Sequence, residues 1–179
     1  MALVLLSAFA AQSASAQVNS NASTVALNAV MAETLGITAS PSTVNFTLAP
    51  GSTAAGSAPV VVSSSWVLSA TRGTVNLYAW FGTPAAALTD GASTPDNIPS
   101  SEVYASLPNG IPTAMTSFSQ SNTLGAANGG LKLYTQTLSS SNRESSRSDS
   151  VSLQINLASQ PQLPAGTYTG TLNVQVQAL

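Results

Sequence analysis

The chain has 179 residues and a net charge of −2, with only four basic and six acidic side chains, and it contains neither Cys nor His. Without Cys or His there are no thiol nucleophiles, no Ser-His or Cys-His relays and none of the usual zinc or copper ligands, so we expect no enzyme and no cofactor. The chain also lacks the Lys/Arg surplus that binding to a phosphate backbone requires, which argues against nucleic acid as a partner.

The first sixteen residues have the pattern of a secretory signal peptide. Residues 1–11 are apolar over about the length of a signal core, and Ala14-Ser15-Ala16 supplies small residues at the cleavage spacing, although no Lys or Arg precedes the apolar run. The alternative is a buried N-terminal strand or helix. We expect cleavage after Ala16 and export to the periplasm or cell surface of a bacterium. No later segment is apolar for long enough to cross a membrane.

From Gln17 onward, short alternating runs separated by turn residues predict β-strands, and no stretch keeps a helical period. A strand with one apolar and one polar face must lay its apolar face on another layer, so the pattern predicts one all-β domain over 17–179, an antiparallel β-sandwich of about seven to nine strands. The predicted strands are 24–30, 34–39, 43–48, 60–70, 74–81, 131–138, 150–158 and 167–178.

The run 74–81 differs from the other predicted strands because it has apolar bulk on both faces. We expect it to lie in the centre of a sheet or to be covered by a loop. The long irregular stretch 82–130 predicts an excursion that wraps the domain with one or two short edge strands, or alternatively forms a binding rim.

Few residues are candidates for metal binding, catalysis or docking. Asp90 and Asp96 share a loop with several oxygen donors, which favours a solvated turn over a calcium site, since the spacing is not that of an EF-hand. With Glu102 they could in principle form the acid and base of a glycosidase, but no pattern in the sequence places two of them across a sugar-binding cleft. Residues 143–149 hold four charges and predict a polar hairpin loop with weak local ion pairs, or alternatively a docking spot.

The aromatic residues allow two interpretations. Trp66 has the parity of the apolar residues around it, which predicts a core position. Trp80 shares a face with Asn76 and Tyr78, so we consider Tyr78 and Trp80 as a candidate platform for stacking on sugar rings.

The two ends of the chain after the signal resemble secreted bacterial pilin and spore-coat-U-like subunits. The resemblance rests on 23–30 (Ser-Thr-Val-Ala-Leu-Asn-Ala-Val), 35–39 (Leu-Gly-Ile-Thr-Ala) and 165–174 (Ala-Gly-Thr-Tyr-Thr-Gly-Thr-Leu-Asn-Val). It implies an incomplete immunoglobulin-like sandwich that is completed by the N-terminal strand of a neighbour. In that role Val25, Leu27 and Val30 are the candidate donor residues. The pairing cysteines and near-terminal aromatic frequent in such subunits are missing here.

A shorter segment, Trp66-Val67-Leu68, is similar to the Trp-x-Leu motif of domains that attach to bacterial cell walls. We therefore hold two main hypotheses, with a small secreted enzyme as a third, well behind them. The first is an exported, non-enzymatic structural subunit that associates with itself or with another surface subunit by β-strand addition. The second is a carbohydrate- or cell-wall-binding β-sandwich module with a glycan partner.

Overall fold

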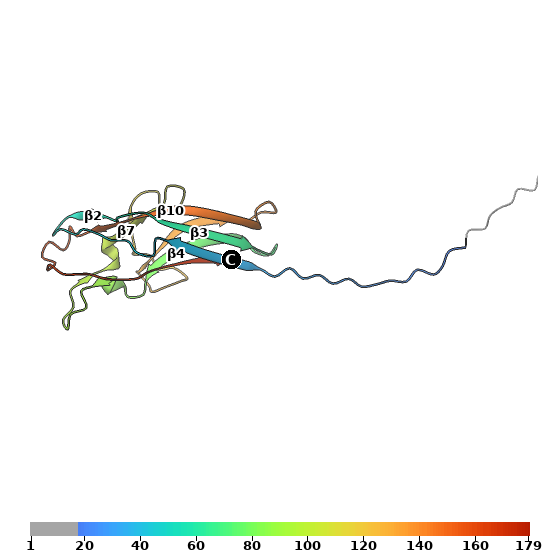
Figure 1. Cartoon of the computed structure of the whole chain (residues 1–179), viewed down its shortest axis with the longest axis horizontal. Helices are drawn as coiled ribbons and strands as arrows, with labels where there is room; N and C mark the ends of the chain where they lie inside the picture. Colours follow the sequence, from blue (N-terminus) through green and yellow to red (C-terminus); the bar gives the residue numbers. More distant parts are fainter. Residues whose placement is uncertain (1–17) are drawn as a thin grey trace, which may run out of the picture. The chain divides into compact units, whose positions relative to one another are not determined.

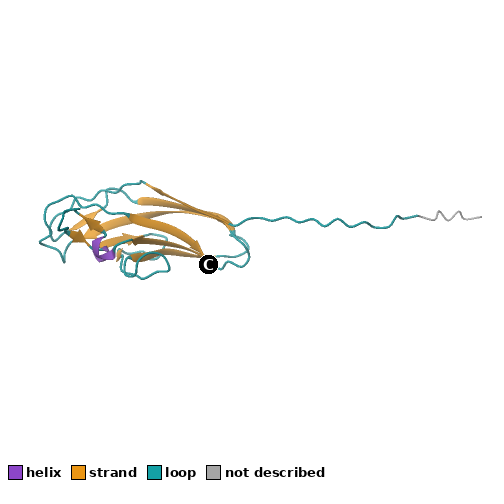
Figure 2. Cartoon of the chain, turned by 90° about the horizontal axis from the view of Figure 1, so that it is seen from below, coloured by secondary structure: helices purple, strands orange, loops and turns teal. Residues whose placement is uncertain are grey.

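The computed structural model describes residues 18–179. The predicted signal and its cleavage after Ala16 lie outside the described residues. One compact unit covers residues 32–179, and residues 18–31 lie outside it. Residues 18–31 contain no strand, and every one of their side chains is exposed. Figure 2 draws this segment as loop.

The compact unit is all-β, as predicted, and its strands form antiparallel sheets of six, three and two strands, consistent with a β-sandwich (Figures 1 and 2). The described residues form no α-helix, only two short 3-10 turns, η1 (Pro84–Ala86) and η2 (Ser100–Glu102). The strands are β1 (Thr34–Ser40), β2 (Thr53–Ala55), β3 (Val60–Val67), β4 (Thr74–Phe81), β5 (Leu88–Thr89), β6 (Asn97–Ile98), β7 (Val103–Ser106), β8 (Thr116–Ser117), β9 (Gly130–Thr137), β10 (Glu144–Asn156) and β11 (Leu172–Ala178).

The six-stranded sheet has the order β1-β3-β10-β7-β8, and β2 also pairs with β10. Its long strand is β10, whose first part pairs with β3 from Glu144↔Val67 to Val151↔Val60. Its second part pairs with β2 and β7. β10 therefore joins the two halves of the larger sheet.

The three-stranded sheet has the order β11-β4-β9. β4 has the predicted bounds 74–81, and it is the central strand, as its apolar bulk on both faces predicted. A register shift between Leu77 and Tyr78 interrupts its pairing with β9.

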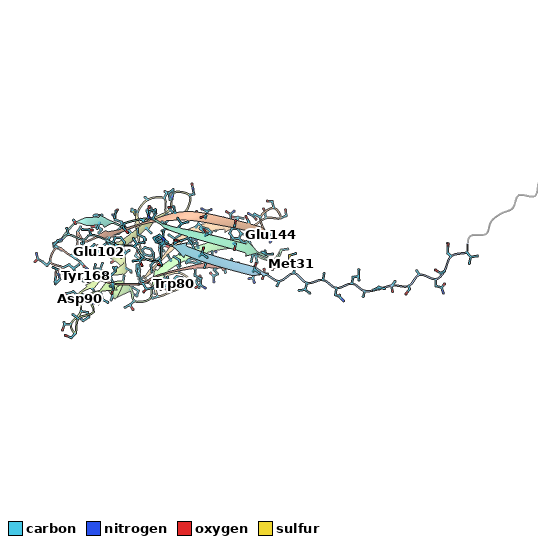
Figure 3. The ribbon with its side chains drawn as sticks, viewed as in Figure 1. Met31, Trp80, Asp90, Glu102, Glu144 and Tyr168 are labelled. Atoms are coloured by element: carbon cyan, nitrogen blue, oxygen red, sulfur yellow. The ribbon has the colours of Figure 1, made fainter. Side chains whose placement is uncertain are left out.

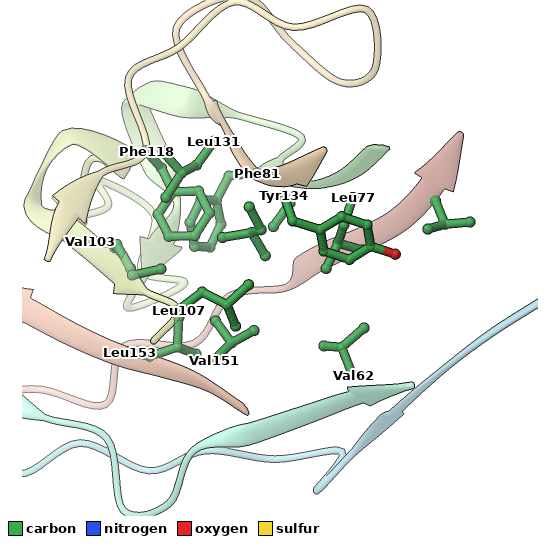
Figure 4. Close-up of a cluster of buried hydrophobic side chains, with 14 of the residues drawn as sticks. Val62, Leu77, Phe81, Val103, Leu107, Phe118, Leu131, Tyr134, Val151 and Leu153 are labelled. Atoms are coloured by element: carbon green, nitrogen blue, oxygen red, sulfur yellow. The ribbon is translucent and has the colours of Figure 1, made fainter. Parts of the chain in front are cut away.

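One hydrophobic core lies within the compact unit, built from residues of both larger sheets (Figure 4). Alternation along β4 and β10 turns every second side chain toward this core, whereas β9, whose pairing with β4 has a register shift, contributes the consecutive residues Leu133 and Tyr134. In the core, Phe81 and Phe118 meet edge to face with ring centroids 5.2 Å apart. Its largest fully buried side chains are Tyr134, Phe118, Leu77, Ile98, Leu107, Leu131, Leu133, Ile155 and Leu157.

Three sequence predictions about elements are wrong. No strand forms at 24–30, because the alternation there finds no pairing partner among residues 18–179. Residues 43–48 form only an isolated bridge, Phe46↔Gly56. Residues 144–149 are not a hairpin loop but the first half of β10, paired along their length with β3.

The excursion 82–130 contains four short strands, β5 to β8, where one or two were predicted. Its Ser100 is 1 % exposed, and the Ser100 hydroxyl donates to the carbonyl oxygen of Phe118 (2.7 Å) and to that of Asn128 (3.1 Å). These bonds tie distant parts of the excursion to each other, so it is an ordered wrapping segment.

Candidate functional site

The outer strands of the two larger sheets have edges without a strand partner, and the longest of these strands are β1, β9 and β11. Of the three, β9 has its first residues covered by Gln120, which bridges to Gly130 and accepts a hydrogen bond from the Lys132 N–H. β1 pairs only with β3, and β11 pairs only with β4. Because a strand edge without a partner presents free N–H and C=O groups, each edge is able to accept a further strand. Among the described residues, β1 and β11 are thus two edges of seven residues each at which a sheet could accept a further strand.

The core is incompletely covered along these two strands. Leu35 and Ile37 of β1 stand opposite the inward-facing Trp66 and Ser64 of β3, yet Leu35 is 39 % exposed and Ile37 is half-buried. On β11, Val174 stands opposite the fully buried Ala79 and is itself only half-buried. The inner faces of β1 and β11 therefore have apolar surface that an additional strand would cover.

A depression of about 300 Å³ connects the start of β1 with the end of β11. Its apolar lining comes from both sheets, so it opens directly onto the edge of the core. The residues that line it are Glu33, Thr34, Leu35, Leu68, Arg72, Val176, Gln177 and Ala178.

At the mouth of this depression Glu33 is held by the turn between β3 and β4. The Ser69 N–H donates to Glu33 Oε1 (2.8 Å), and Arg72 Nη2 donates to Glu33 Oε2 (2.9 Å). The hydrogen bonds from Arg72, more than any other cause, hold the pKa of Glu33 at about 2, below its usual 4.5. Arg143 Nη1 donates to the carbonyl oxygens of Ser69 (2.6 Å) and Arg72 (3.2 Å), which fixes the turn from its other side. We call Glu33, Ser69, Arg72 and Arg143 the junction clamp.

The candidate donor residues lie in the exposed segment 18–31. Val25 is 80 % exposed, Leu27 90 % and Val30 97 %. In an extended chain, residues two apart share a face, so Val25 and Leu27 share one with Met31 but not with Val30. The donor role of Val25, Leu27 and Val30 stays a prediction, and in an extended segment Met31, not Val30, continues the row of Val25 and Leu27.

The candidate glycan platform is not an exposed pair of rings. Tyr78 is 6 % exposed and Trp80 is half-buried, because the loop at Gly125 packs on the Trp80 ring. Asn76, on the same face, is 4 % exposed and accepts a hydrogen bond from the Thr135 hydroxyl (2.7 Å). Because Tyr78 is buried and Trp80 is half-buried, the two rings do not form the exposed pair that we expected.

Trp66 is buried, as predicted from its parity. Its side chain is 3 % exposed, and its Nε1 donates to the carbonyl oxygen of Asn142 (2.9 Å). The Trp-x-Leu segment therefore contributes to the core, since Leu68 is buried as well.

A buried polar cluster was missed by the sequence interpretation. Asp149 is 6 % exposed and accepts a hydrogen bond from Arg147 Nε, while the Arg147 guanidinium lies 4.5 Å from the centre of the Tyr134 ring. The Tyr134 hydroxyl is 2.9 Å from Ser64 Oγ and so links the two larger sheets. Burial raises the pKa of Tyr134, and the hydrogen bond with Ser64 opposes this shift. Arg147 Nη2 also donates to the carbonyl oxygen of Asn109 (2.6 Å).

Two of the three candidate catalytic carboxylates, Asp90 and Glu102, accept hydrogen bonds from other residues of the chain. Asp90 Oδ1 accepts hydrogen bonds from the N–H groups of Ala92 (3.1 Å) and Asp96 (3.2 Å), which is the predicted Asx-type turn. Glu102 accepts a hydrogen bond from the Ser159 hydroxyl. Figure 3 labels Asp90 and Glu102 near one end of the compact unit and Glu144 near the other. Among residues 18–179, no three acidic side chains gather in a way suited to a metal ion.

Family models, curated proteins and solved structures were compared with the chain, and none of them matches it. In the part of the chain that the structure describes, no helix has the length and apolar character to cross a bilayer.

Proposed function

We propose that the chain is an exported, non-enzymatic structural subunit of a bacterial cell-surface or extracellular assembly, in which subunits associate by β-strand addition. The observation that carries the proposal is the coexistence of an unpaired, alternating apolar segment at 18–31 and two open strand edges, β1 and β11, over a half-covered core. The immunoglobulin-like, pilin-like arrangement of the sandwich is part of the same proposal.

Donor and acceptor complement each other chemically. Residues 18–31 contain no charged side chain, and the inner faces of β1 and β11 are apolar. A strand laid along these edges would satisfy the free N–H and C=O groups of the edge and turn Val25, Leu27 and Met31 toward the core.

The free energy of association can be estimated from the few apolar side chains that the added strand would bury. Full burial of a Val, Leu or Met side chain stabilises by about 1.5–3 kcal/mol each. Replacing Val25 and Leu27 by Ser removes two of these contributions, so association should weaken by about 3–6 kcal/mol, which is roughly 100-fold or more in the dissociation constant.

The export part of the proposal rests on the signal-like first sixteen residues. We expect the chain secreted from a bacterial host to begin at Gln17, and intact-mass measurement of the secreted protein checks this. A protein that retains residues 1–16 in the cytoplasm would contradict the export step while leaving strand addition to its own test.

The assembly part is tested by light scattering over a concentration series of the secreted chain. The wild type should form polymers that grow with concentration, and Val25→Ser/Leu27→Ser should remain a monomer. Val30→Ser is the matched control, because Val30 lies on the opposite face of the extended segment, and it should polymerise like the wild type. A wild type that stays monomeric, or a double variant that polymerises equally well, contradicts strand donation by this segment.

A further inference from the structure

We infer that the outer face of the three-stranded sheet binds a chain of acidic sugars, and that the loop 121–129 covers this site as a movable lid. We call residues 121–129 the lid. The core takes the odd-numbered residues of β4, so the outer face is the one that carries its even-numbered residues. The inference does not depend on strand addition, because the site lies on a face of the sheet and not along its edges.

The outer face brings two aromatic rings together with amide and ammonium groups. Tyr78 and Trp80 of β4 point to this face. Trp80 is paired with Asn173 of β11. Tyr78 lies between Gln175 of β11 and Lys132 of β9. Because paired residues of antiparallel strands turn their side chains to the same face, these five residues form one patch.

Three polar groups of the patch have no partner in the described part of the chain. Within residues 18–179, neither the Trp80 Nε1 nor the Tyr78 hydroxyl forms a hydrogen bond, and neither is one of the fully buried polar atoms. Lys132 forms no ion pair there, since the two described pairs belong to Arg72 and Arg147. Buried Tyr and Trp side chains usually find a hydrogen-bond partner, and here a ligand is able to supply it.

These groups are suited to recognising a sugar chain. Aromatic rings stack on the apolar faces of sugar rings, and amides donate and accept hydrogen bonds as neighbouring hydroxyls require. Lys132 is the only charged residue in β4, β9, β11 and the lid. An ammonium group without an ion-pair partner favours an anionic ligand. Carboxylates on the sugars, as in uronic acids, would complement it.

The ends of the lid are joined at the start of β9. Gln120 and Gly130 bridge through two backbone hydrogen bonds, of 2.8 and 2.9 Å. The Ser121 hydroxyl accepts a hydrogen bond from the Asn128 N–H (3.1 Å) and donates one to Asn128 Oδ1 (3.3 Å). A compact loop whose ends are joined in this way is an Ω-loop. Its base is thus closed independently of the residues in between.

From this base the lid reaches across the sheet. The Thr123 hydroxyl donates to Gln177 Oε1 of β11 (2.9 Å), and the backbone at Gly125 lies on the Trp80 ring of β4. A Cβ added at Gly125 would lie 2.2 Å from Trp80 Cγ, so only glycine permits this approach. The lid therefore covers the patch between β9 and β11.

Residues 122–127 are attached to the sheet more weakly than the base of the lid. Their one hydrogen bond to the sheet is the exposed bond between Thr123 and Gln177, which competes with water. The closed lid also buries the Asn122 Nδ2 without an acceptor, and an unpaired buried donor is unfavourable. Both features lower the cost of opening, and a ligand that binds only the open form shifts the equilibrium toward it.

The experiment measures binding to the full secreted chain by calorimetry and by tryptophan fluorescence. Trp66 is buried in the core, so a change in fluorescence on binding reports on Trp80. The probes are oligomers of galacturonate, glucuronate and mannuronate of equal length. Each is compared with the same oligomer after its carboxylates have been reduced to alcohols, which removes the charge and keeps the sugar rings.

The variants separate the lid from the patch. Thr123→Val removes the bond that holds the lid, and Lys132→Gln removes the positive charge. Thr137→Val is the matched control, the same substitution at an exposed threonine of β9 whose side chain forms no hydrogen bond among the described residues. Because the chain has no Cys, the pair Thr123→Cys/Gln177→Cys can be joined by a short thiol crosslinker that closes the lid and is released by reductant.

We expect the wild type and Thr137→Val to bind at least one acidic oligomer equally well. Thr123→Val should bind it about fivefold more tightly, because a larger fraction of the protein has an open lid. Lys132→Gln, or reduction of the sugar carboxylates, should weaken binding about fivefold. The crosslink should abolish binding, and reductant should restore it.

Three results would overturn the inference. The first is that no acidic oligomer binds to the wild type or to Thr123→Val. The second is that the carboxyl-reduced oligomers bind as tightly as the acidic ones, which contradicts the acidic-sugar ligand. The third is that the crosslinked protein binds as tightly as the same protein after reduction, which shows that the lid does not cover the site. None of these results bears on strand addition by residues 18–31, which has its own test.

Discussion

The ion pair between Arg147 and Asp149 allows two changes in stability to be compared. One follows from replacing a single partner, and the other from replacing both partners by apolar residues. Asp149→Asn keeps the shape of the side chain but leaves the Arg147 guanidinium without its anionic partner. Removing one partner of a buried pair costs about 3–5 kcal/mol. Arg147 retains 22 % side-chain exposure, its bond to Asn109 and its place over the Tyr134 ring, so we expect a loss at or below the lower limit of this range, about 2–3 kcal/mol.

The comparison variant is Arg147→Met/Asp149→Val, which removes both charges and fills the site with apolar atoms. Such replacements are often neutral or stabilising, so we expect a change within about 1 kcal/mol of the wild type. The Tyr134 hydroxyl keeps its bond to Ser64 in this variant, so no buried hydroxyl is left without a partner.

Urea unfolding at pH 7, followed by the fluorescence of the buried Trp66, measures both variants. Both variants are made in the Val25→Ser/Leu27→Ser background, which we expect to be monomeric, so that association does not contribute to the measured stability. An Asp149→Asn variant that loses less than about 1 kcal/mol, or a double variant that loses as much as the single one, would refute the reasoning.

The remaining predictions concern the junction clamp and the cover over Trp80. Because the folded pKa of Glu33 is about 2 and its ordinary value is 4.5, the stability that Glu33 contributes should be fully present above pH 5 and disappear as the pH falls from about 4.5 to 2. The difference in unfolding free energy between the wild type and Glu33→Gln should follow that curve, and a difference that stays constant down to pH 2 would contradict it. Gly125 has φ +83°, and an added Cβ would overlap the Trp80 ring, so Gly125→Ala should cost about 1–3 kcal/mol and raise acrylamide quenching of Trp80. Unchanged quenching together with unchanged stability would show that the loop does not cover the ring.

The parts of the fold that follow from local pattern were predictable. β4 was placed at its observed bounds because its alternation is regular and bulk on both faces is a property of the strand itself. Trp66 was assigned to the core by its parity with neighbouring apolar residues, and its burial confirms this. Both inferences need only the residues of one strand.

What the sequence did not reveal depends on partners far away in the chain. Arg147 and Asp149 look like loop residues because charge and Ser around them hide the alternation, and their burial depends on Tyr134 from β9 and Ser64 from β3. The short strands β5 to β8 have too few residues to show a period, so their existence depends on tertiary pairing. The open edges at β1 and β11 are likewise invisible in the sequence, because an absent neighbour leaves no pattern.

The pairing of β1 with β3 determines how the subunit would resist a pulling force. The seven residues of β1 are all matched with β3, from Thr34↔Val67 to Ser40↔Val61. A fibre built by donation of residues 18–31 would pull on β1 along its own axis, from the end where the junction clamp lies. Force in that direction shears all the β1–β3 hydrogen bonds at once, whereas a force across the strand would open them one by one. The subunit would thus be strongest in the direction in which a fibre is stretched, and stretching a tethered chain by atomic force microscopy would measure the resistance of this ladder.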